Sequence, residues 1–309
     1  MLSVQDDYVG TGHLPGKFPE MGSEQLTCEH CGNTFPDSRN NCPHCAKPQI
    51  FPNVSKANSV LHKSRLDERF NRKRQECEAD GRADVFERFQ TAAAGSHALF
   101  ACPLLKLHRE VASGTEIFET YYQLEELRLR GTLFGQLDWE RLRPQAEIEL
   151  LGSHHHIENL HYACLSIDWD ALSSYGDCIV RLDEQMIAHR ASCFEGNTAV
   201  IFFVYGNFDH YLRSSWSDRG KLAATVFADQ LQSGISDSEF PKILVSPGVD
   251  AVDDAFIEVH VFGTLTARSF SEVRFSDRCS GPRESVYRDA IIEKMKAASE
   301  SRTRTGSVS

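Results

Sequence analysis

The sequence predicts an α+β protein with a small zinc-binding module near its N-terminus. Two Cys-x-x-Cys pairs lie close together early in the chain of 309 residues. Apolar residues at helical spacing dominate residues 60–150, whereas residues 151–298 combine helical segments with short runs of β-branched and aromatic residues. We therefore expect a flexible leader over residues 1–25, a zinc ribbon over 26–50, a helical region, a mixed α+β domain, and a disordered tail over 299–309.

The zinc-binding module consists of four cysteines, Cys28, Cys31, Cys42 and Cys45. Four thiolates complete the tetrahedral shell of a structural Zn²⁺ ion, which would hold together a segment too small to bury a core. His30 or His44, inside the pairs, could replace a neighbouring thiolate. Disulfides are not expected because the N-terminus lacks the basic start and apolar run of a signal peptide. A redox Cys-x-x-Cys would normally stand alone beside a strand and helix.

Composition excludes several broad classes of protein. The net charge of −11 and the isoelectric point near 5.6 disfavour a broad basic surface for nucleic acid. No apolar stretch approaches the length of a membrane span, so we expect no membrane association. The six cysteines outside the module are scattered, as expected for buried thiols in a reducing cytoplasm, and we expect a cytoplasmic protein.

The first long helix is expected at residues 61–90, where basic and acidic side chains alternate. A narrow apolar stripe along it consists of Leu66, Phe70 and Cys77. The simpler interpretation is a solvated helix that links the zinc module to the rest of the chain. The alternative is that the basic run at residues 69–74 contacts phosphate.

Further elements follow from hydrophobic periodicity. Helices are expected at residues 117–127, 146–151, 157–164, 222–231 and after Ser285, and strands at 178–182, 199–204, 242–245 and 256–262. Three histidines, at 154–156, would lie at the N-terminus of the third of these helices, where the helix dipole favours neutral imidazole. No Walker or dinucleotide-binding glycine motif is present.

The strand at 256–262 carries the clearest candidate for catalysis. Because side chains alternate along a strand, Glu258 and His260 project together between Phe256 and Phe262. The opposite, core-facing side consists of Ile257, Val259 and Val261. A carboxylate flanked by aromatic rings is typical of the floor of a cleft, and partial burial would raise its pKa. The alternative is an edge strand with an incidental acidic residue.

A second group of polar and aromatic residues lies near two expected strands. Its members are Tyr175, Arg190, Ser192, Phe194 and Asn197. Such residue types can hold phosphate and ribose. The alternative for Arg190 is a surface ion pair with Glu195 or Asp183.

The order of these features resembles that of ADP-ribosyltransferases, above all those of bacterial toxins and defence systems. The resemblance extends over roughly residues 153–265 and is carried by His-Ile-Glu-Asn-Leu at 156–160, by the Tyr175-Gly176 turn, and by Glu258 within Phe-Ile-Glu-Val-His-Val-Phe-Gly. It implies a split, antiparallel-rich sheet with NAD bound across it. The sequence has no Ser-Thr-Ser motif, and His260 stands where a Glu-x-Glu motif would have its second glutamate, which leaves the target residue open.

The resemblance also implies roles for individual residues. Glu258, with His260 beside it, would act in catalysis by stabilising an oxocarbenium-like transition state. NAD would be bound by His155, His156, Tyr175, Arg190, Ser192, Phe194 and Asn197, with Tyr175 or Phe194 stacked on nicotinamide, Arg190 on the pyrophosphate, and a histidine on a ribose hydroxyl. The helical and zinc-binding segments would select a macromolecular target or bind a neutralising protein.

Two other functions remain possible interpretations of the sequence. The first is a zinc-ribbon adaptor that binds protein or nucleic acid without catalysis, for which Glu258 would be unimportant. The second is a metal-dependent nuclease, which would require a cluster of acidic or histidine ligands that the C-terminal half does not display.

Overall fold

The computed structural model describes residues 25–27, 33–36, 44, 51–112, 117–120, 122, 142–151, 157–172, 175–248 and 253–305. Outside the described residues lie Cys28, Cys31, Cys42 and Cys45 of the expected zinc ribbon, together with His155 and His156. Two short strands, β1 (Gln25–Thr27) and β2 (Thr34–Pro36), pair antiparallel and come before and after the first Cys-x-x-Cys pair in the sequence.

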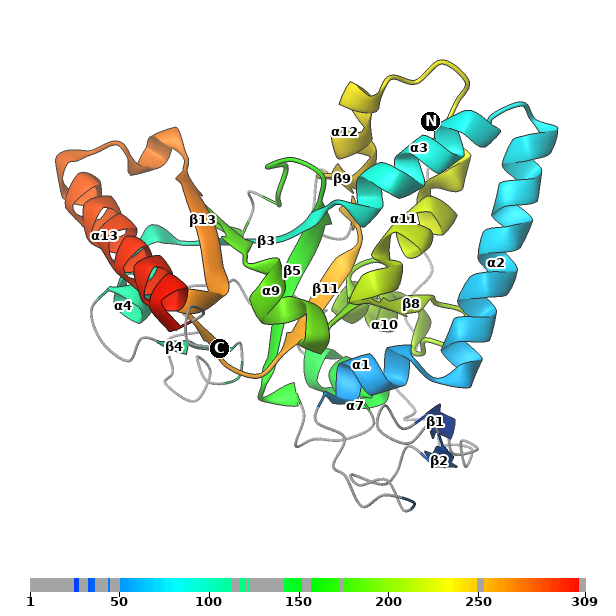
Figure 1. Ribbon diagram of the computed structural model, residues 1–309, viewed down its shortest axis with the longest axis horizontal. Helices are drawn as coiled ribbons and strands as arrows, with labels where there is room; N and C mark the ends of the chain where they lie inside the picture. The colour runs from blue at the N-terminus through cyan, green and yellow to red at the C-terminus, as the bar shows by residue number, and fades with distance from the viewer. Residues whose placement is uncertain are drawn as a thin grey trace, which may run out of the picture.

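A seven-stranded antiparallel sheet forms the centre of the described fold (Figure 1). The strand order is β13-β6-β3-β5-β11-β7-β8. The bounds are β3 (His97–Cys102), β5 (Leu160–Ser166), β6 (Cys178–Leu182), β7 (Ala191–Phe194), β8 (Arg213–Ser215), β11 (Glu258–Phe262) and β13 (Phe270–Phe275). Two further two-stranded pairs consist of β4 (Ile117–Phe118) with β12 (Leu265–Thr266) and β9 (Val245–Ser246) with β10 (Ala255–Phe256). The expected α+β class is confirmed.

Helices surround this sheet. They are α1 (Pro52–Ala57), α2 (Val60–Ala79), α3 (Ala83–Ala94), α4 (Leu104–Val111), α7 (Arg143–Leu151), α9 (Glu184–Ile187), α10 (Thr198–Tyr205), α11 (Arg219–Phe227), α12 (Phe240–Leu244) and α13 (Pro282–Thr305). In Figure 1, α2, α3 and α11 lie together on the right, whereas α4 and α13 lie on the left near β13. Helix α13 extends past residue 298 into the segment expected to be a disordered tail. Within the described residues, each helix is too short or too polar to cross a bilayer.

The charged helix expected at residues 61–90 is divided in the structure into α2 and α3, and α2 matches its first part. Leu66, Phe70 and Cys77 are buried along one side, as the apolar stripe predicts. Several of its cations are engaged by carboxylates of the same chain: Arg69 by Glu195, Lys73 by Asp229 and Arg74 by Glu87. These contacts favour a helix that packs on the body over one that presents its basic run to phosphate.

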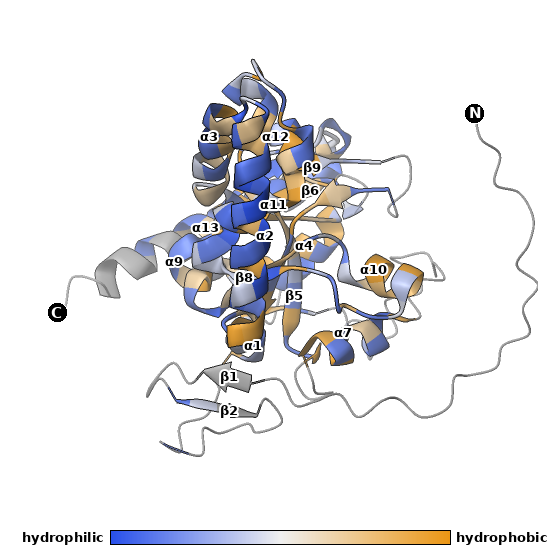
Figure 2. Cartoon of the chain, turned by 90° about the vertical axis from the view of Figure 1, so that its right-hand side faces the viewer, coloured by the Kyte–Doolittle hydropathy of each residue, from blue (hydrophilic) through white to orange (hydrophobic). Residues whose placement is uncertain are grey.

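Two expected strands are helices. Residues 199–204 lie in α10, because the Asn197 side chain accepts hydrogen bonds from the backbone N–H groups of Ala199 and Val200 and so starts a helix. Gly206 ends the helix with a positive φ of 72°. Figure 2 shows that α10 is apolar over most of its length, which explains its likeness to a buried strand. Similarly, 242–244 belong to α12, and Val245 begins β9.

The helices expected at 157–164 and 117–127 are also wrong where the structure describes them. Residues 160–166 form strand β5, and Ile117 and Phe118 form β4. Leu160 and Cys164 are four residues apart, and this spacing places side chains on one face of either a helix or a strand. Strand β3, in the region expected to be dominated by helices, lies inside the sheet between β6 and β5.

The sheet opens between β3 and β5. These strands pair only through His97 with Ser166, Ala98 with Leu165 and Leu99 with Cys164. Among the described strands, β3 pairs only with β6 beyond Leu99, as far as Cys102, whereas the first residues of β5 pair only with β11. The remaining halves of β3 and β5 therefore diverge, and the candidate site lies where they separate.

Candidate functional site

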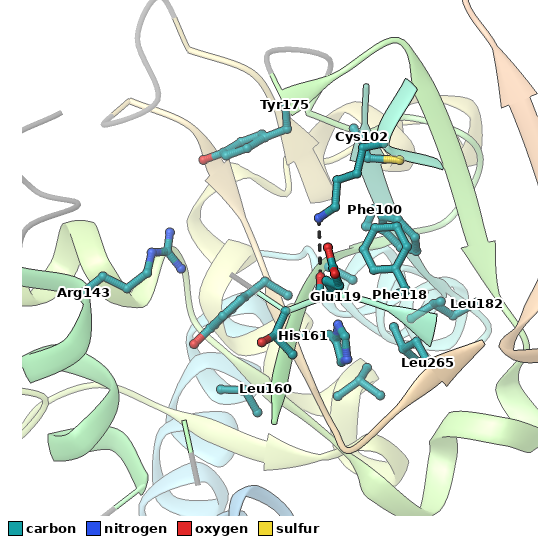
Figure 3. Close-up of a pocket in the computed structure, with 16 residues that line it drawn as sticks. Phe100, Cys102, Phe118, Glu119, Arg143, Leu160, His161, Tyr175, Leu182 and Leu265 are labelled. Carbon is teal, nitrogen blue, oxygen red and sulfur yellow. Dashed lines mark hydrogen bonds between the residues drawn. The ribbon is translucent and has the colours of Figure 1, made fainter. Parts of the chain in front are cut away.

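Two adjoining cavities, of about 140 and 100 Å³, lie at the opening of the sheet. Both are lined by Phe100, Ala101, Arg143, Tyr162, Ala163 and Tyr175. Figure 3 shows Tyr175 and Arg143 on one side of the larger cavity and Phe100 and Phe118 on the other. Because the two cavities share these walls, we treat them as two halves of one cleft.

Glu258 lies in the wall of the smaller cavity and is only 4% exposed. Its Oε2 atom accepts hydrogen bonds from the backbone N–H and the hydroxyl of Thr198, at 3.0 and 2.7 Å. Thr198 is the first residue of α10, so the carboxylate also lies at the positive end of that helix. The hydrogen bonds described for this carboxylate all involve Oε2.

The charge state of Glu258 differs from the expectation. Burial acts to raise the pKa of Glu258, but the hydrogen bond and charge of His260, the charge of Arg143 and the hydroxyl of Thr198 lower it below its usual value. The expected rise is therefore wrong, because burial was considered without the partners that come with it. Glu258 is ionised at neutral pH.

His260 holds the Glu258 carboxylate by a hydrogen bond. Its Nε2 lies 3.0 Å from Glu258 Oε2, and an ionised acceptor requires the proton to be on Nε2. The imidazole is stacked against Phe194 with ring centroids 6.2 Å apart and meets Tyr162 edge-on at 5.4 Å. Among the described lining residues, His260 belongs to neither cavity. The contacts therefore assign it to positioning the carboxylate.

The core-facing side of this strand is confirmed. Ile257, Val259 and Val261 are fully buried in the main hydrophobic core. Phe256 also lines the smaller cavity, and Phe262 packs on a second apolar cluster that includes Phe194. Glu258 is therefore in a central strand, β11, and not at a sheet edge.

Tyr175 and Asn197, expected to contact a ligand, both lie at the cleft. Tyr175 lines both cavities, and Asn197 lines the smaller one beside Glu258 while capping α10. The Tyr175-Gly176 turn packs against the end of β3, since a Cβ on Gly176 would come within 2.1 Å of the Cys102 carbonyl carbon. A glycine is required there to bring Tyr175 to the cleft.

Arg190 and Ser192 lie away from the described cavity walls. The Arg190 guanidinium donates to the carbonyl oxygens of Met186, Phe262 and Thr264. The Ser192 hydroxyl accepts from the Asn53 side chain, which also donates to the carbonyl oxygens of Arg190 and His260. These contacts give Arg190 a role in holding backbone segments, and they differ from the expected surface pair with Glu195 or Asp183.

The cleft residues that did not appear in the sequence-based site include Lys106, Arg143, His161 and Tyr162. The Arg143 guanidinium lies 5.0 Å from the Tyr162 ring centroid and pairs with Glu147 at 3.5 Å. Burial, with the charges of Lys106 and Arg190, lowers the pKa of His161 to about 3, so its imidazole is neutral. The alternation of Leu160, His161 and Tyr162 would have indicated this wall if β5 had been predicted as a strand.

No protein-family model matches the chain, and no curated protein sequence matches it. Within the part of the chain that the structure describes, no cluster of three or more His, Cys, Asp or Glu side chains is arranged to hold a metal ion. The function must therefore be argued from the cleft itself.

Proposed function

We propose that the chain is an NAD-dependent ADP-ribosyltransferase that transfers ADP-ribose to a macromolecular target. One observation carries the proposal: Glu258 is an ionised carboxylate in the wall of an aromatic-lined cleft at the point where an antiparallel sheet opens. Structural Zn²⁺ bound by Cys28, Cys31, Cys42 and Cys45 is part of the proposal, on the basis of their spacing alone.

The cleft offers groups that suit the parts of NAD. Tyr175, Tyr162 and Phe100 supply aromatic surfaces for flat heterocycles. Lys106 supplies positive charge at one end of the cleft and Glu258 negative charge at the other, and the cation Arg143 lines both halves. Bound NAD would provide an anomeric carbon whose bond to nicotinamide breaks.

Glu258 would stabilise the positive charge that develops on the ribose as this bond weakens. Thr198 and His260 hold one carboxylate oxygen, so the group is fixed before substrate arrives and needs no reorganisation during the reaction. Arg143 and His260 keep the side chain ionised in spite of burial. The buried, apolar walls would exclude water and strengthen this electrostatic interaction.

The adaptor alternative has one observation in its favour. Glu258 accepts two hydrogen bonds from the first residue of α10, and capping this helix is a sufficient structural role for a buried carboxylate. In that case neither NAD binding nor nicotinamide release would depend on Glu258.

Titration calorimetry with NAD and a transfer assay with labelled NAD test the proposal. We expect wild type and Glu258→Gln to bind NAD with similar affinity and only wild type to release nicotinamide and label a target. Glu195→Gln is a matched control, because the Glu195 side chain is 9% exposed, pairs with Arg69 and does not belong to the described cavity walls. Unchanged activity in Glu258→Gln, or no binding of NAD by wild type, would refute the proposal.

A further inference from the structure

The larger half of the cleft contains a buried lysine. Lys106, from α4, is 9% exposed and lines the cavity of about 140 Å³. Its ammonium group lies 4.3 Å from the Phe118 ring centroid and 3.5 Å from the carbonyl oxygen of Glu119. A buried ammonium group is costly to a protein unless a negative partner accompanies it.

The nearby carboxylates are engaged by another cation. Arg109 binds Glu110 and Glu119, each at 2.7 Å, and Glu110 also accepts the backbone N–H of Glu119. Within the described part of the chain, no carboxylate lies within ion-pair distance of Lys106. Burial accordingly lowers the pKa of Lys106, although Glu110 partly opposes it. Among the described residues, the amine therefore faces the cavity without a carboxylate at ion-pair distance.

The other groups around this cavity do not supply a negative charge to Lys106. His161 is a neutral imidazole, and Arg143, across the cavity, is a second cation whose partner Glu147 is on its own helix. Phe100, Phe118 and Leu265 make the rest of the wall mainly apolar. Glu119 also lines this cavity, but its carboxylate is bound by Arg109. Within the described residues, a lysine without an ion-pair partner in mainly apolar walls is suited to a compact anion.

We propose that Lys106 is the anion-binding residue of the cleft and binds a phosphate group of the nucleotide substrate. The phosphate oxygens would supply the counter-ion that the described residues do not provide, and Arg143 would add charge from the opposite wall. This inference rests on the proposed function, because it identifies which end of the cleft takes the phosphates of NAD. It also assigns a different part of NAD to each end of the cleft, with a phosphate group at Lys106 and the reacting ribose at Glu258.

The test uses ADP, inorganic pyrophosphate, adenosine and NAD as probes, with calorimetry and thermal unfolding of the full-length protein. Lys106→Met and Lys106→Gln remove the charge, and Lys63→Met is the control, since Lys63 is an exposed lysine on α2. We expect wild type to bind ADP and pyrophosphate, and both Lys106 variants to bind ADP and NAD at least about tenfold more weakly. Adenosine, which has no phosphate, should bind wild type and the variants alike.

Stability separates binding from a merely structural role. A lysine needed for folding would lower the melting temperature when replaced, whereas an unpaired buried cation should leave the ligand-free melting temperature unchanged or raised on replacement by Met. The inference is overturned if the Lys106 variants bind ADP within about threefold of wild type, a difference below 1 kcal/mol, or if wild type binds neither ADP nor pyrophosphate.

The two proposals fail separately. Lys106-dependent binding of ADP without any cleavage of NAD would refute the transferase and uphold the phosphate site. Glu258-dependent cleavage of NAD with undiminished affinity in Lys106→Met would uphold the transferase and refute the phosphate site.

Discussion

Replacing Glu258 with glutamine removes one charge and leaves the shape of the side chain almost unchanged. The glutamine carbonyl oxygen can still accept the two hydrogen bonds from Thr198, which are 3.0 and 2.7 Å long in the wild type. Each bond loses its ionic component, about 1 kcal/mol. The desolvation cost of a buried charge, several kcal/mol, disappears at the same time. We therefore expect the free energy of unfolding to change by no more than about 2 kcal/mol.

The effect on the reaction should be much larger. Loss of a preorganised electrostatic partner of a charged transition state costs about 3–4 kcal/mol, or a factor of 10²–10³ in rate. Because the charge on the ribose develops only as the bond breaks, the affinity for NAD should change little. Glu258→Gln should thus lower kcat for nicotinamide release and leave KM nearly constant.

The assay is the rate of nicotinamide release from NAD, measured beside urea unfolding of the same samples. Glu195→Gln should unfold normally and retain the wild-type rate, since its carboxylate contacts Arg69 and not the cleft. A rate in Glu258→Gln within about threefold of wild type, with the variant folded, would refute the reasoning, because that is below 1 kcal/mol of transition-state stabilisation.

Four further changes have defined outcomes. Thr198→Val removes a 2.7 Å hydrogen bond to Glu258. It should slow nicotinamide release about tenfold and lower the free energy of unfolding in urea by about 1–2 kcal/mol. An unchanged rate would contradict the role of Thr198 in positioning Glu258. Asn53→Ala removes buried hydrogen bonds to two carbonyl oxygens and a hydroxyl and should lower the unfolding free energy by about 2–3 kcal/mol, which urea titration would measure. Burial raises the pKa of Glu195 from 4.5 to about 7. The contribution of Glu195 to stability is therefore present below pH 4.5 and lost as the pH rises through 7, and this loss lowers the free energy of unfolding by at most about 3 kcal/mol. Glu195→Gln should reduce this decline in a pH series of melting temperatures. Cys42→Ser should abolish binding of one zinc ion per chain in metal analysis, and retention of stoichiometric zinc would exclude Cys42 as a ligand.

The sequence predicted the strand that carries the candidate site because its two faces differ in chemistry. A period of two places Val259 and Val261 on one side of the strand and Glu258 and His260 on the other. The structure buries the valines in the core. The long charged helix was also predictable, from a stripe of apolar residues among paired charges. In both cases local pattern and burial agree.

Other elements were ambiguous in the sequence for a physical reason. Strand β5 places Leu160 and Cys164 four residues apart, a spacing that both periods allow. Helix α10 is apolar enough to be a buried strand, and only the cap from Asn197 decides for a helix. Capping depends on hydrogen bonds from the N–H groups of Ala199 and Val200, two and three residues further on, so composition alone did not reveal it.

The cleft itself depends on contacts between distant parts of the chain. Glu258, Tyr175 and Asn197 were predictable as single residues, but Lys106 and Arg143 reach the same cleft from helices far apart in the sequence. Their proximity follows from where β3 and β5 stop pairing, which no local motif encodes. The direction of the Glu258 pKa shift was missed because burial was considered alone. His260 on the same strand lowers the pKa, and Arg143 and Thr198, from distant parts of the chain, lower it further.

The ionised state of Glu258 argues for a role beyond helix capping. A neutral glutamine or a serine could satisfy the N–H and hydroxyl of Thr198 without a buried charge. Instead, the protein surrounds a fully buried carboxylate with His260, Arg143 and the helix N-terminus, all of which favour the anion. A neutral acceptor would cap the helix without the desolvation cost of a buried charge, so capping alone does not account for the anion. A developing positive charge in the adjoining cavity is the partner that this geometry suits, and Glu258→Gln removes the charge while keeping the cap.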